Sequence, residues 1–194
     1  MVEATEEMQK YFQSIETELK KNFEIATKAR QLNLDPESKV DIKLAKNMAE
    51  RVEALIGIVA PQIIGCGITK RIIDLEKKFG HLDWRVALTI ALEVAQQKFC
   101  KFEDNKLAIE IGIRTGFAYQ TAGIVAAPLE GFIELKIKKT NDGKDYLAPC
   151  YAGPIRGAGG TAAAFSLMIV DYLRTKLGFA KYDPSEAEIN RYKT

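Results

Sequence analysis

The sequence has few cysteines and histidines, and this scarcity excludes several kinds of site. Cys66, Cys100 and Cys150 are the three cysteines in 194 residues, no CxxC pair occurs, and His81 is the one histidine. We therefore expect neither a structural zinc site nor a disulfide framework, because both need clustered ligands or paired cysteines. A Ser-His-Asp triad cannot be built around His81, which lies in a predicted turn. A reduced, cytoplasmic setting fits this composition best.

Long apolar runs and an excess of one charge are also lacking. The most apolar stretches, GIVAPQIIGCGI and GIVAAPL, are too short and too interrupted by Gly and Pro to cross a bilayer. The opening MVEATEEMQK is polar and acidic, so we expect no signal peptide. Lys and Arg total 28 against 26 Asp and Glu, and this balance indicates no particular partner. The hydrophobic content of 47% predicts a folded, soluble protein.

The acidic residues show no pattern of a metal-dependent active site. Two-metal nucleotidyl transfer needs clustered carboxylates, and no DxD or comparable pair occurs beside glycines or in a predicted strand. Most acidic residues decorate helix faces instead. We therefore expect no catalytic centre and no cofactor in this chain.

Apolar periodicity predicts an α+β fold that begins with a long amphipathic helix. Over residues 3–31 apolar side chains recur at three- and four-residue steps among Glu and Lys, and Asn33 and Pro36 then mark a loop over residues 33–43. Residues 1–32 are predicted to be an assembly helix. Its candidate contact residues are Phe12, Ile15, Leu19 and Phe23. Docking to another chain and support of its own domain are both open interpretations.

A mainly helical domain is predicted over residues 44–123. Helical spacing covers 44–57 and 68–80, with stops at Gly57 and Gly80. Asp83 is the predicted N-cap of a helix over 84–100, and Asp104 precedes another helix. Three aromatic residues around the following apolar stretch are predicted to be core residues rather than stacking platforms for bases: Phe117, Tyr119 and Phe132.

Residues 124–194 are predicted to form a small α/β part. GFIELKIKK alternates, which places Ile133, Leu135 and Ile137 on one strand face, and an Asp-Gly turn leads to a second strand in YLAPCYAG. AAAFSLMIVDYLRTKLG predicts a buried helix that begins at Thr161 as N-cap and ends at Gly178.

The glycine-rich segment YAGPIRGAGGTAAAF, residues 151–165, joins strand and helix. No Lys-Ser or Lys-Thr follows its glycines, so a Walker A loop is excluded, and the matches to GxGxxG and to the GxxG of KH domains lack the expected flanking elements. Free amides at a helix N-terminus beside Arg156 are suited to a phosphate of a nucleic-acid backbone. In the alternative interpretation the glycines allow tight packing and Arg156 pairs with a carboxylate.

AGIVAAPLEG at 122–131 and YLAPCYAGPIRGAGGTAAAFSLMIVDYLRTKLG at 146–178 resemble the N-terminal part of the large subunit of archaeal D-family DNA polymerase, also called DNA polymerase II. The resemblance extends back through NMAERVEALIG and EIATKAR, so it covers essentially the whole chain.

This resemblance implies that the chain is a piece of a longer subunit of a DNA-directed DNA polymerase. In this family the aspartates that bind Mg lie beyond Thr194. This chain alone is therefore predicted to be inactive. The implied partners are primer-template DNA, the small subunit with its 3'-5' proofreading exonuclease, the rest of the large subunit and the sliding clamp. These imply a heterodimer that acts in DNA replication in the cytoplasm, with no membrane contact.

For this part of the subunit, the resemblance implies assembly and DNA binding. The expected DNA-facing surface combines the hairpin lysines with the glycine segment. Its candidate residues are Lys136, Lys138, Lys139, Lys144, Arg156, Gly157, Gly159, Gly160 and Thr161. The main alternative is a protein-interaction scaffold with no nucleic-acid contact, and a free-standing nucleotide-binding enzyme comes third.

Overall fold

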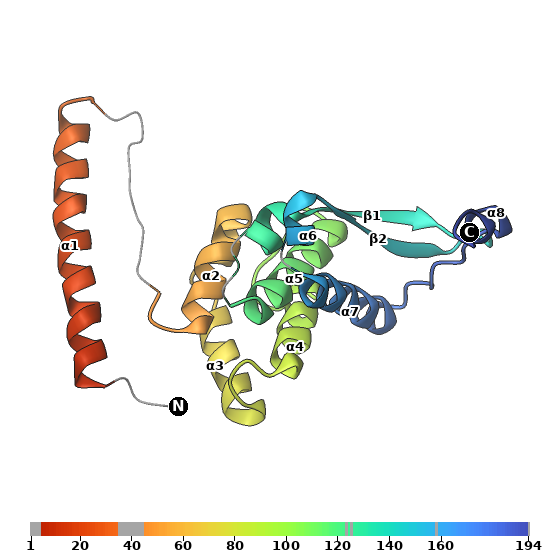
Figure 1. Ribbon diagram of the computed structural model, residues 1–194, viewed down its shortest axis with the longest axis horizontal. Coiled ribbons are helices and arrows are strands. Elements are labelled where there is room, and N and C mark those ends of the chain that lie inside the picture. The colour runs from red at the N-terminus through yellow and green to blue at the C-terminus, as the bar shows by residue number, and fades with distance from the viewer. Residues whose placement is uncertain (1–4, 35–44, 123, 125, 158, 194) are drawn as a thin grey trace. The chain divides into compact units, whose positions relative to one another are not determined.

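The structure is a computed structural model that describes residues 5–34, 45–122, 124, 126–157 and 159–193, apart from the side chains of Pro154 and Arg156. It divides into two compact units, Met1–Ala45 and Lys46–Thr194. The predicted loop over 33–43 lies largely outside the described residues. The α+β class is confirmed, because helices dominate and one antiparallel hairpin lies near the C-terminal end (Figure 1).

The first unit contains helix α1, Glu6–Gln31, as the periodicity predicts. The Thr5 hydroxyl accepts a hydrogen bond from the Met8 amide at 3.3 Å and caps the helix start, and Asn33 adopts a left-handed φ of 56° just after its end. None of the residues in α1, all of which the structure describes, is buried. Phe12 is exposed, and Ile15, Leu19 and Phe23 are half-buried, so the apolar stripe of α1 is covered only in part.

In the second unit four helices form the helical layer, in chain order. They are α2 Met48–Val59, α3 Ile68–Phe79, α4 Trp84–Ala95 and α5 Asn105–Gln120, with the short 3-10 helix η1 Pro61–Ile63 after α2. Asp83 and Asp104 cap α4 and α5 as predicted, because their carboxylates accept hydrogen bonds from amides of the first turn.

Two predicted helix ends are wrong. α2 continues past Gly57 to Val59, and a Cβ at Gly57 would lie 2.7 Å from the Ile64 side chain. This glycine therefore permits a close side-chain contact instead of ending the helix. α4 ends at Ala95 rather than near Cys100, because Gln97 turns the chain with a φ of 56°.

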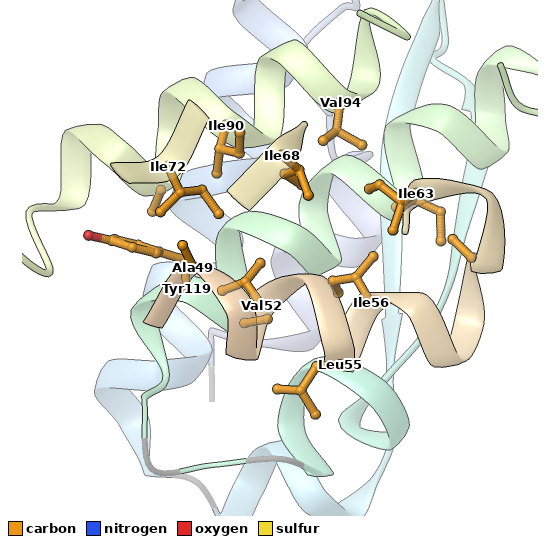
Figure 2. Close-up of a cluster of buried hydrophobic side chains, with 14 of the residues drawn as sticks. Ala49, Val52, Leu55, Ile56, Ile63, Ile68, Ile72, Ile90, Val94 and Tyr119 are labelled. Carbon is orange, nitrogen blue, oxygen red and sulfur yellow. The ribbon is translucent and has the colours of Figure 1, made fainter. Parts of the chain in front are cut away.

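The helical layer encloses the first of two hydrophobic clusters, called the helical core here. Figure 2 shows side chains from all four helices converging on it, among them Val52, Ile72, Ile90 and Tyr119. Tyr119 and Phe117 are both fully buried, which confirms their predicted place in the interior. The Tyr119 hydroxyl donates to Glu76 Oε1 at 2.8 Å and accepts from the Leu82 amide at 2.9 Å, so its polar end is satisfied.

The hairpin consists of β1, Phe132–Lys139, and β2, Asp145–Tyr151, joined by a turn in which Gly143 has a φ of 81°. The prediction that Ile133, Leu135 and Ile137 share a buried face is wrong for two of them. A bulge between Phe132 and Glu134 puts Phe132 and Leu135 on the inner face, and Ile133 is 51% exposed. Ile137 is 39% exposed, and the strand residues around it are exposed as well.

After the hairpin the chain forms a short helix, α6 Gly153–Gly157, and then α7, Gly160–Leu177. Thr161 is not the N-cap of α7, because Gly159 takes that place with a φ of 88° that favours glycine. The predicted stop at Gly178, with a φ of 80°, is confirmed. The prediction that α7 is buried holds for one face only, since Leu167 is 52% exposed.

The second hydrophobic cluster joins the hairpin and α7 to the helical layer. It contains residues of α4, α5, β1 and α7, including Ile113, Phe117, Phe132 and Ile169, all fully buried. Because α4 and α5 contribute to both clusters, the ranges 44–123 and 124–194 pack as one compact unit. Their description as separate domains stays a prediction.

The chain end lies beside the hairpin tip, where helix α8, Glu186–Arg191, follows a capping box at Ser185. The Asp183 carboxylate accepts hydrogen bonds from the Asn141 amide at 3.0 and 3.3 Å, and the rings of Tyr146 and Tyr182 lie 5.3 Å apart. Figure 1 shows α8 at this tip.

A buried arginine of α5 fixes the start of the hairpin. Arg114 is 5% exposed, and its guanidinium forms an ion pair with Glu110 at 2.9 Å. It also donates hydrogen bonds of 2.6–3.0 Å to the carbonyl oxygens of Pro128, Leu129, Phe132 and Ile133. The second Glu110 oxygen accepts from the Leu135 amide at 2.9 Å. Through this pair, α5 holds the π-helix η2, Ala127–Gly131, and the bulged start of β1.

We expect Arg114→Met to lower the free energy of unfolding by about 3–5 kcal/mol, because it leaves the buried Glu110 carboxylate without its partner. Urea unfolding followed by circular dichroism measures this loss. Arg85→Met is the matched control, since Arg85 pairs with Asp83 at 2.8 Å with about half of its side chain exposed, and we expect a much smaller change. Equal losses in the two variants would contradict the role of Arg114.

Candidate nucleic-acid interface

The hairpin lysines predicted to face DNA are mostly paired with carboxylates. Lys136 contacts Glu134 at 2.9 Å, Lys139 contacts Asp145 at 2.8 Å, and Lys144 contacts Asp142 at 2.6 Å. Lys138 is exposed and forms no ion pair with a residue in the described part of the chain. Three of the four hairpin lysines are thus partly neutralised on the hairpin itself, although their side chains stay accessible.

The pairs Lys144–Asp142 and Lys136–Glu134 shift the pKa values of both of their partners. Hydrogen bonds from Lys144 and then Thr140 lower the pKa of Asp142 to about 2, and Asp142 raises the pKa of Lys144 in return. Glu134 likewise raises the pKa of Lys136, and Lys136 lowers that of Glu134. All these groups therefore keep their charges at neutral pH, and a phosphate would compete with a carboxylate at each pair.

The hairpin tip and the end of α7 enclose a pocket of about 380 Å³, called the tip pocket here. Its lining residues are Lys139, Gly143, Lys144, Asp145, Leu177, Gly178, Phe179 and Ala180. The Ala180 amide donates to the Asp145 carbonyl at 2.8 Å and holds the two segments together. The structure thus brings Lys139 and Lys144 to one hollow. Lys181, which we did not predict, follows directly in the chain.

The sequence from the hairpin to the residue after the tip pocket has more basic than acidic residues, although Asp183 also lies at the tip. Between residues 136 and 181 the sequence has eight Lys or Arg and three Asp. Arg174 and Lys176 belong to this set, and they lie in the last turn of α7. The run RTKLGFAKY could have indicated them, but the sequence interpretation used it only to place the end of a helix at Gly178.

The glycine segment lies at the other end of the hairpin. β2 leads from the tip at Asp145 to Tyr151, a run of about 20 Å at ~3.4 Å per residue, and α6 follows there, as Figure 1 shows. The structure therefore does not join the tip lysines and the predicted residues Gly157, Gly159, Gly160 and Thr161 into one patch. The Arg156 side chain lies outside the described residues, so its predicted phosphate contact and the alternative carboxylate contact both stay predictions.

The glycines of this segment do not serve internal packing. A Cβ built at Gly153, Gly157, Gly159 or Gly160 meets no atom within 4 Å. By contrast, a Cβ at Gly112 in α5 would lie 2.5 Å from the carbonyl oxygen of Ala91 in α4. A glycine thus permits close packing at Gly112 of α5, and the interpretation that the glycine segment serves tight packing is wrong. The glycine segment leaves open space through which another molecule can approach the backbone.

The start of α7 offers backbone donors in that open space. Gly159 caps the helix without a side-chain hydrogen bond, and Gly159, Gly160 and Thr161 are all exposed. Amides in the first turn of a helix have no partner within the helix, and they carry the positive end of the helix dipole. This arrangement is suited to an anion such as a phosphate.

The described residues contain no cluster of candidate metal ligands. No three His, Cys, Asp or Glu side chains there lie close enough together to hold a metal ion. His81 is exposed, and its Nδ1 lies 2.8 Å from Glu76 Oε1. The buried pair Arg114–Glu110 was missed by the sequence interpretation. Its signal is the i,i+4 spacing of opposite charges inside the apolar run LAIEIGIRTGFAY.

Comparison with known proteins then identifies the family. The family model described as "DNA polymerase II large subunit DP2, N-terminal" matches residues 10–194. The chain belongs to this family. It is 48% identical over 183 residues to the DNA polymerase II large subunit of Nanoarchaeum equitans, and 44% identical over 187 residues to that of Thermoplasma volcanium. Against the Pyrococcus abyssi large subunit the identity is 42% over 192 residues. The resemblance inferred from the glycine segment is thereby confirmed.

The chain spans only a small part of these relatives. The matches cover 94–98% of this chain but 15% of the Nanoarchaeum equitans subunit, 16% of the Thermoplasma volcanium subunit and 13% of the Pyrococcus abyssi subunit. Among the described residues, no helix combines the length and apolar character that a membrane span needs.

We expect Gly112→Ala to lower the free energy of unfolding by about 1–3 kcal/mol, because the new methyl group must push α4 and α5 apart. Gly157→Ala is the matched control and should leave stability unchanged or slightly raised, since its methyl group enters open space. Thermal unfolding of the two variants beside the wild type measures the difference. A comparable loss in Gly157→Ala would show that the glycine segment is packed after all.

Proposed function

We propose that this chain is the N-terminal assembly and DNA-binding region of a replicative DNA polymerase large subunit. The assembly to which it belongs carries out template-directed DNA synthesis with 3'-5' proofreading, uses Mg, and acts in the cytoplasm with a small exonuclease subunit and a sliding clamp. Membership of the DNA polymerase II large subunit family supports this role. Polymerisation belongs to the whole assembly, and this chain alone is inactive.

The single observation that carries DNA contact is the open glycine segment at the start of α7. Exposed glycines with free space around them let a phosphate backbone approach the amides of Gly159, Gly160 and Thr161. The tip pocket adds Lys139 and Lys144 at the far end of the hairpin, each paired with a carboxylate for which a phosphate can compete. Such contacts bind the backbone of DNA without reading its sequence.

DNA binding by this chain should therefore be salt-dependent and independent of sequence. We expect Arg156→Ala to weaken binding equally for all sequences and to reduce the salt slope by roughly one unit. A Lys136/Lys138/Lys139 triple alanine variant should also weaken binding. Fluorescence anisotropy of a labelled primer-template duplex over a salt series measures both effects.

Two further variants make this test sharper. Asp142→Asn frees Lys144 from its ion pair, so it should strengthen binding at low salt. Lys77→Ala on α3 removes an exposed lysine away from the hairpin and should have little effect. Each variant must keep the melting temperature of the wild type. If the wild type binds no duplex even at low salt, DNA contact is refuted and the scaffold alternative, which the paired hairpin lysines favour, replaces it.

The assembly role rests on α1. No side chain of its apolar stripe is fully buried: Phe12 is 47% exposed, and Ile15, Leu19 and Phe23 are half-buried. A helix of 26 residues with such a stripe gains stability by packing against another surface. The small subunit and the rest of the large subunit are the surfaces that the family provides.

We expect the double variant Leu19→Asp/Phe23→Asp to weaken assembly of the complete large subunit with the small subunit at least tenfold, because each buried apolar side chain contributes about 1.5–3 kcal/mol. Sedimentation of the reconstituted complex measures this. Thr17→Asp, on the opposite face of α1, is the control and should not weaken assembly. Unchanged assembly in the double variant would leave α1 as a support for its own subunit.

A further inference from the structure

Two tyrosine rings lie together at the hairpin tip. Tyr146 is the second residue of β2, and Tyr182 lies in the connection between α7 and α8. The ring centroids are 5.3 Å apart, with 48° between the ring planes. Tyr146 is half-buried, whereas Tyr182 is 50% exposed and its hydroxyl donates to Glu188 Oε1 at 2.6 Å. One ring thus supports a second ring that stays accessible to solvent.

The connection that carries Tyr182 is tied to the hairpin on both sides of the ring. Before it, the Ala180 amide donates to the Asp145 carbonyl at 2.8 Å. After it, the Asp183 carboxylate accepts from the Asn141 amide at 3.0 Å, and the Asp183 carbonyl accepts from the Asn141 side chain at 3.1 Å. Figure 1 shows this connection reaching the hairpin tip. The ring is therefore held in place before any ligand binds, which lowers the entropic cost of binding.

An available cation lies beside the two rings. Lys138 is directly opposite Tyr146 in the hairpin register, so both side chains lie on the same face of the two strands. Lys138 is exposed, and within the ranges that the structure describes it is the one hairpin lysine without an ion pair. Its charge can therefore pair with a ligand without first leaving a carboxylate.

We propose that Tyr182, supported by Tyr146, is a stacking site for an unpaired base of single-stranded DNA, and that Lys138 contacts the adjoining phosphate. Proteins bind single strands by stacking bases on exposed aromatic rings beside cations that follow the backbone. A duplex cannot use such a ring, because its bases already stack on one another. The inference rests on the proposed function, since the single strand next to a primer is the template overhang.

Acidic groups around Tyr182 limit the contribution of charge to binding. Asp183 follows it in the chain, and Glu188 accepts the hydrogen bond of its hydroxyl. We therefore expect stacking to contribute more than phosphate contact to the binding of a single strand at this site. Removal of the ring and removal of the lysine should then have different effects, because only the lysine releases a counterion from the DNA.

The test is fluorescence anisotropy of the 194-residue chain with a labelled oligothymidine of about 15 nucleotides and with a duplex of the same length, each over a salt series. We expect Tyr182→Leu to weaken binding of the single strand about tenfold with an unchanged salt slope, and to leave duplex binding unchanged. Tyr182→Phe keeps the ring and should bind like the wild type. Lys138→Ala should reduce the salt slope for the single strand by about 0.7.

A second measurement needs no variant. An oligonucleotide that carries bromodeoxyuridine in place of thymidine is irradiated in complex with the wild type, and the cross-linked peptide is identified by mass spectrometry. We expect the cross-link on Tyr182 or Tyr146. A cross-link found only outside the hairpin and the connection to α8 would overturn the proposal.

Trp84→Leu is the matched control, since Trp84 at the start of α4 is 52% exposed and lies outside the hairpin. It should leave binding of the single strand unchanged, and every variant should melt near the wild type. An equal loss in Trp84→Leu, or no loss in Tyr182→Leu, would overturn the proposal. Binding of the duplex without the single strand would overturn this inference alone and leave the proposed function in place. Failure to bind either DNA would overturn both.

Discussion

The position of the hairpin depends on one buried ion pair. Arg114 and Glu110 face each other across one turn of α5, and between them they bind the carbonyls and the amide of a segment that has no regular pairing of its own. A π-helix followed by a bulge leaves backbone groups without ladder partners, and buried polar groups need partners. The guanidinium supplies five donors in a fixed plane, which is why one side chain can satisfy several carbonyls. Arg51 of α2 likewise donates a hydrogen bond to a backbone carbonyl of another helix, that of Ala118 in α5, at 3.1 Å.

The two ends of the hairpin differ in what they offer to a partner. At the tip, basic side chains border a hollow but share their charge with neighbouring carboxylates. At the base, the exposed amides at the start of α7 carry a partial positive charge. The glycines there have open space around them, so these amides are accessible. A region that binds DNA at both ends of the hairpin would contact phosphates about 20 Å apart. It would do so without contact to any base edge.

The sequence allowed the helices, both aspartate caps, the hairpin, the stop at Gly178 and the family to be predicted, because each depends on local periodicity or on a short motif. It did not allow the bulge at Ile133 to be predicted, since alternation in FIELKIKK hides an extra residue whose effect is set by the contact of Phe132 with the core. The cap at Gly159 was assigned to Thr161 because hydroxyls are common caps, whereas the backbone there needs a positive φ. The tip pocket joins residues about forty positions apart, so no local pattern indicates it.

The contact between α4 and α5 has a mechanical consequence. At Gly112 and Gly116 the two helices touch backbone to backbone, with no layer of side chains whose rotamers can adjust. Closely packed interiors have low compressibility and transmit strain. The same two helices contribute to both hydrophobic clusters. We therefore expect a force applied to the hairpin to pass through Arg114 into α5 and from there into α4, so that hairpin and helices move together as one stiff body.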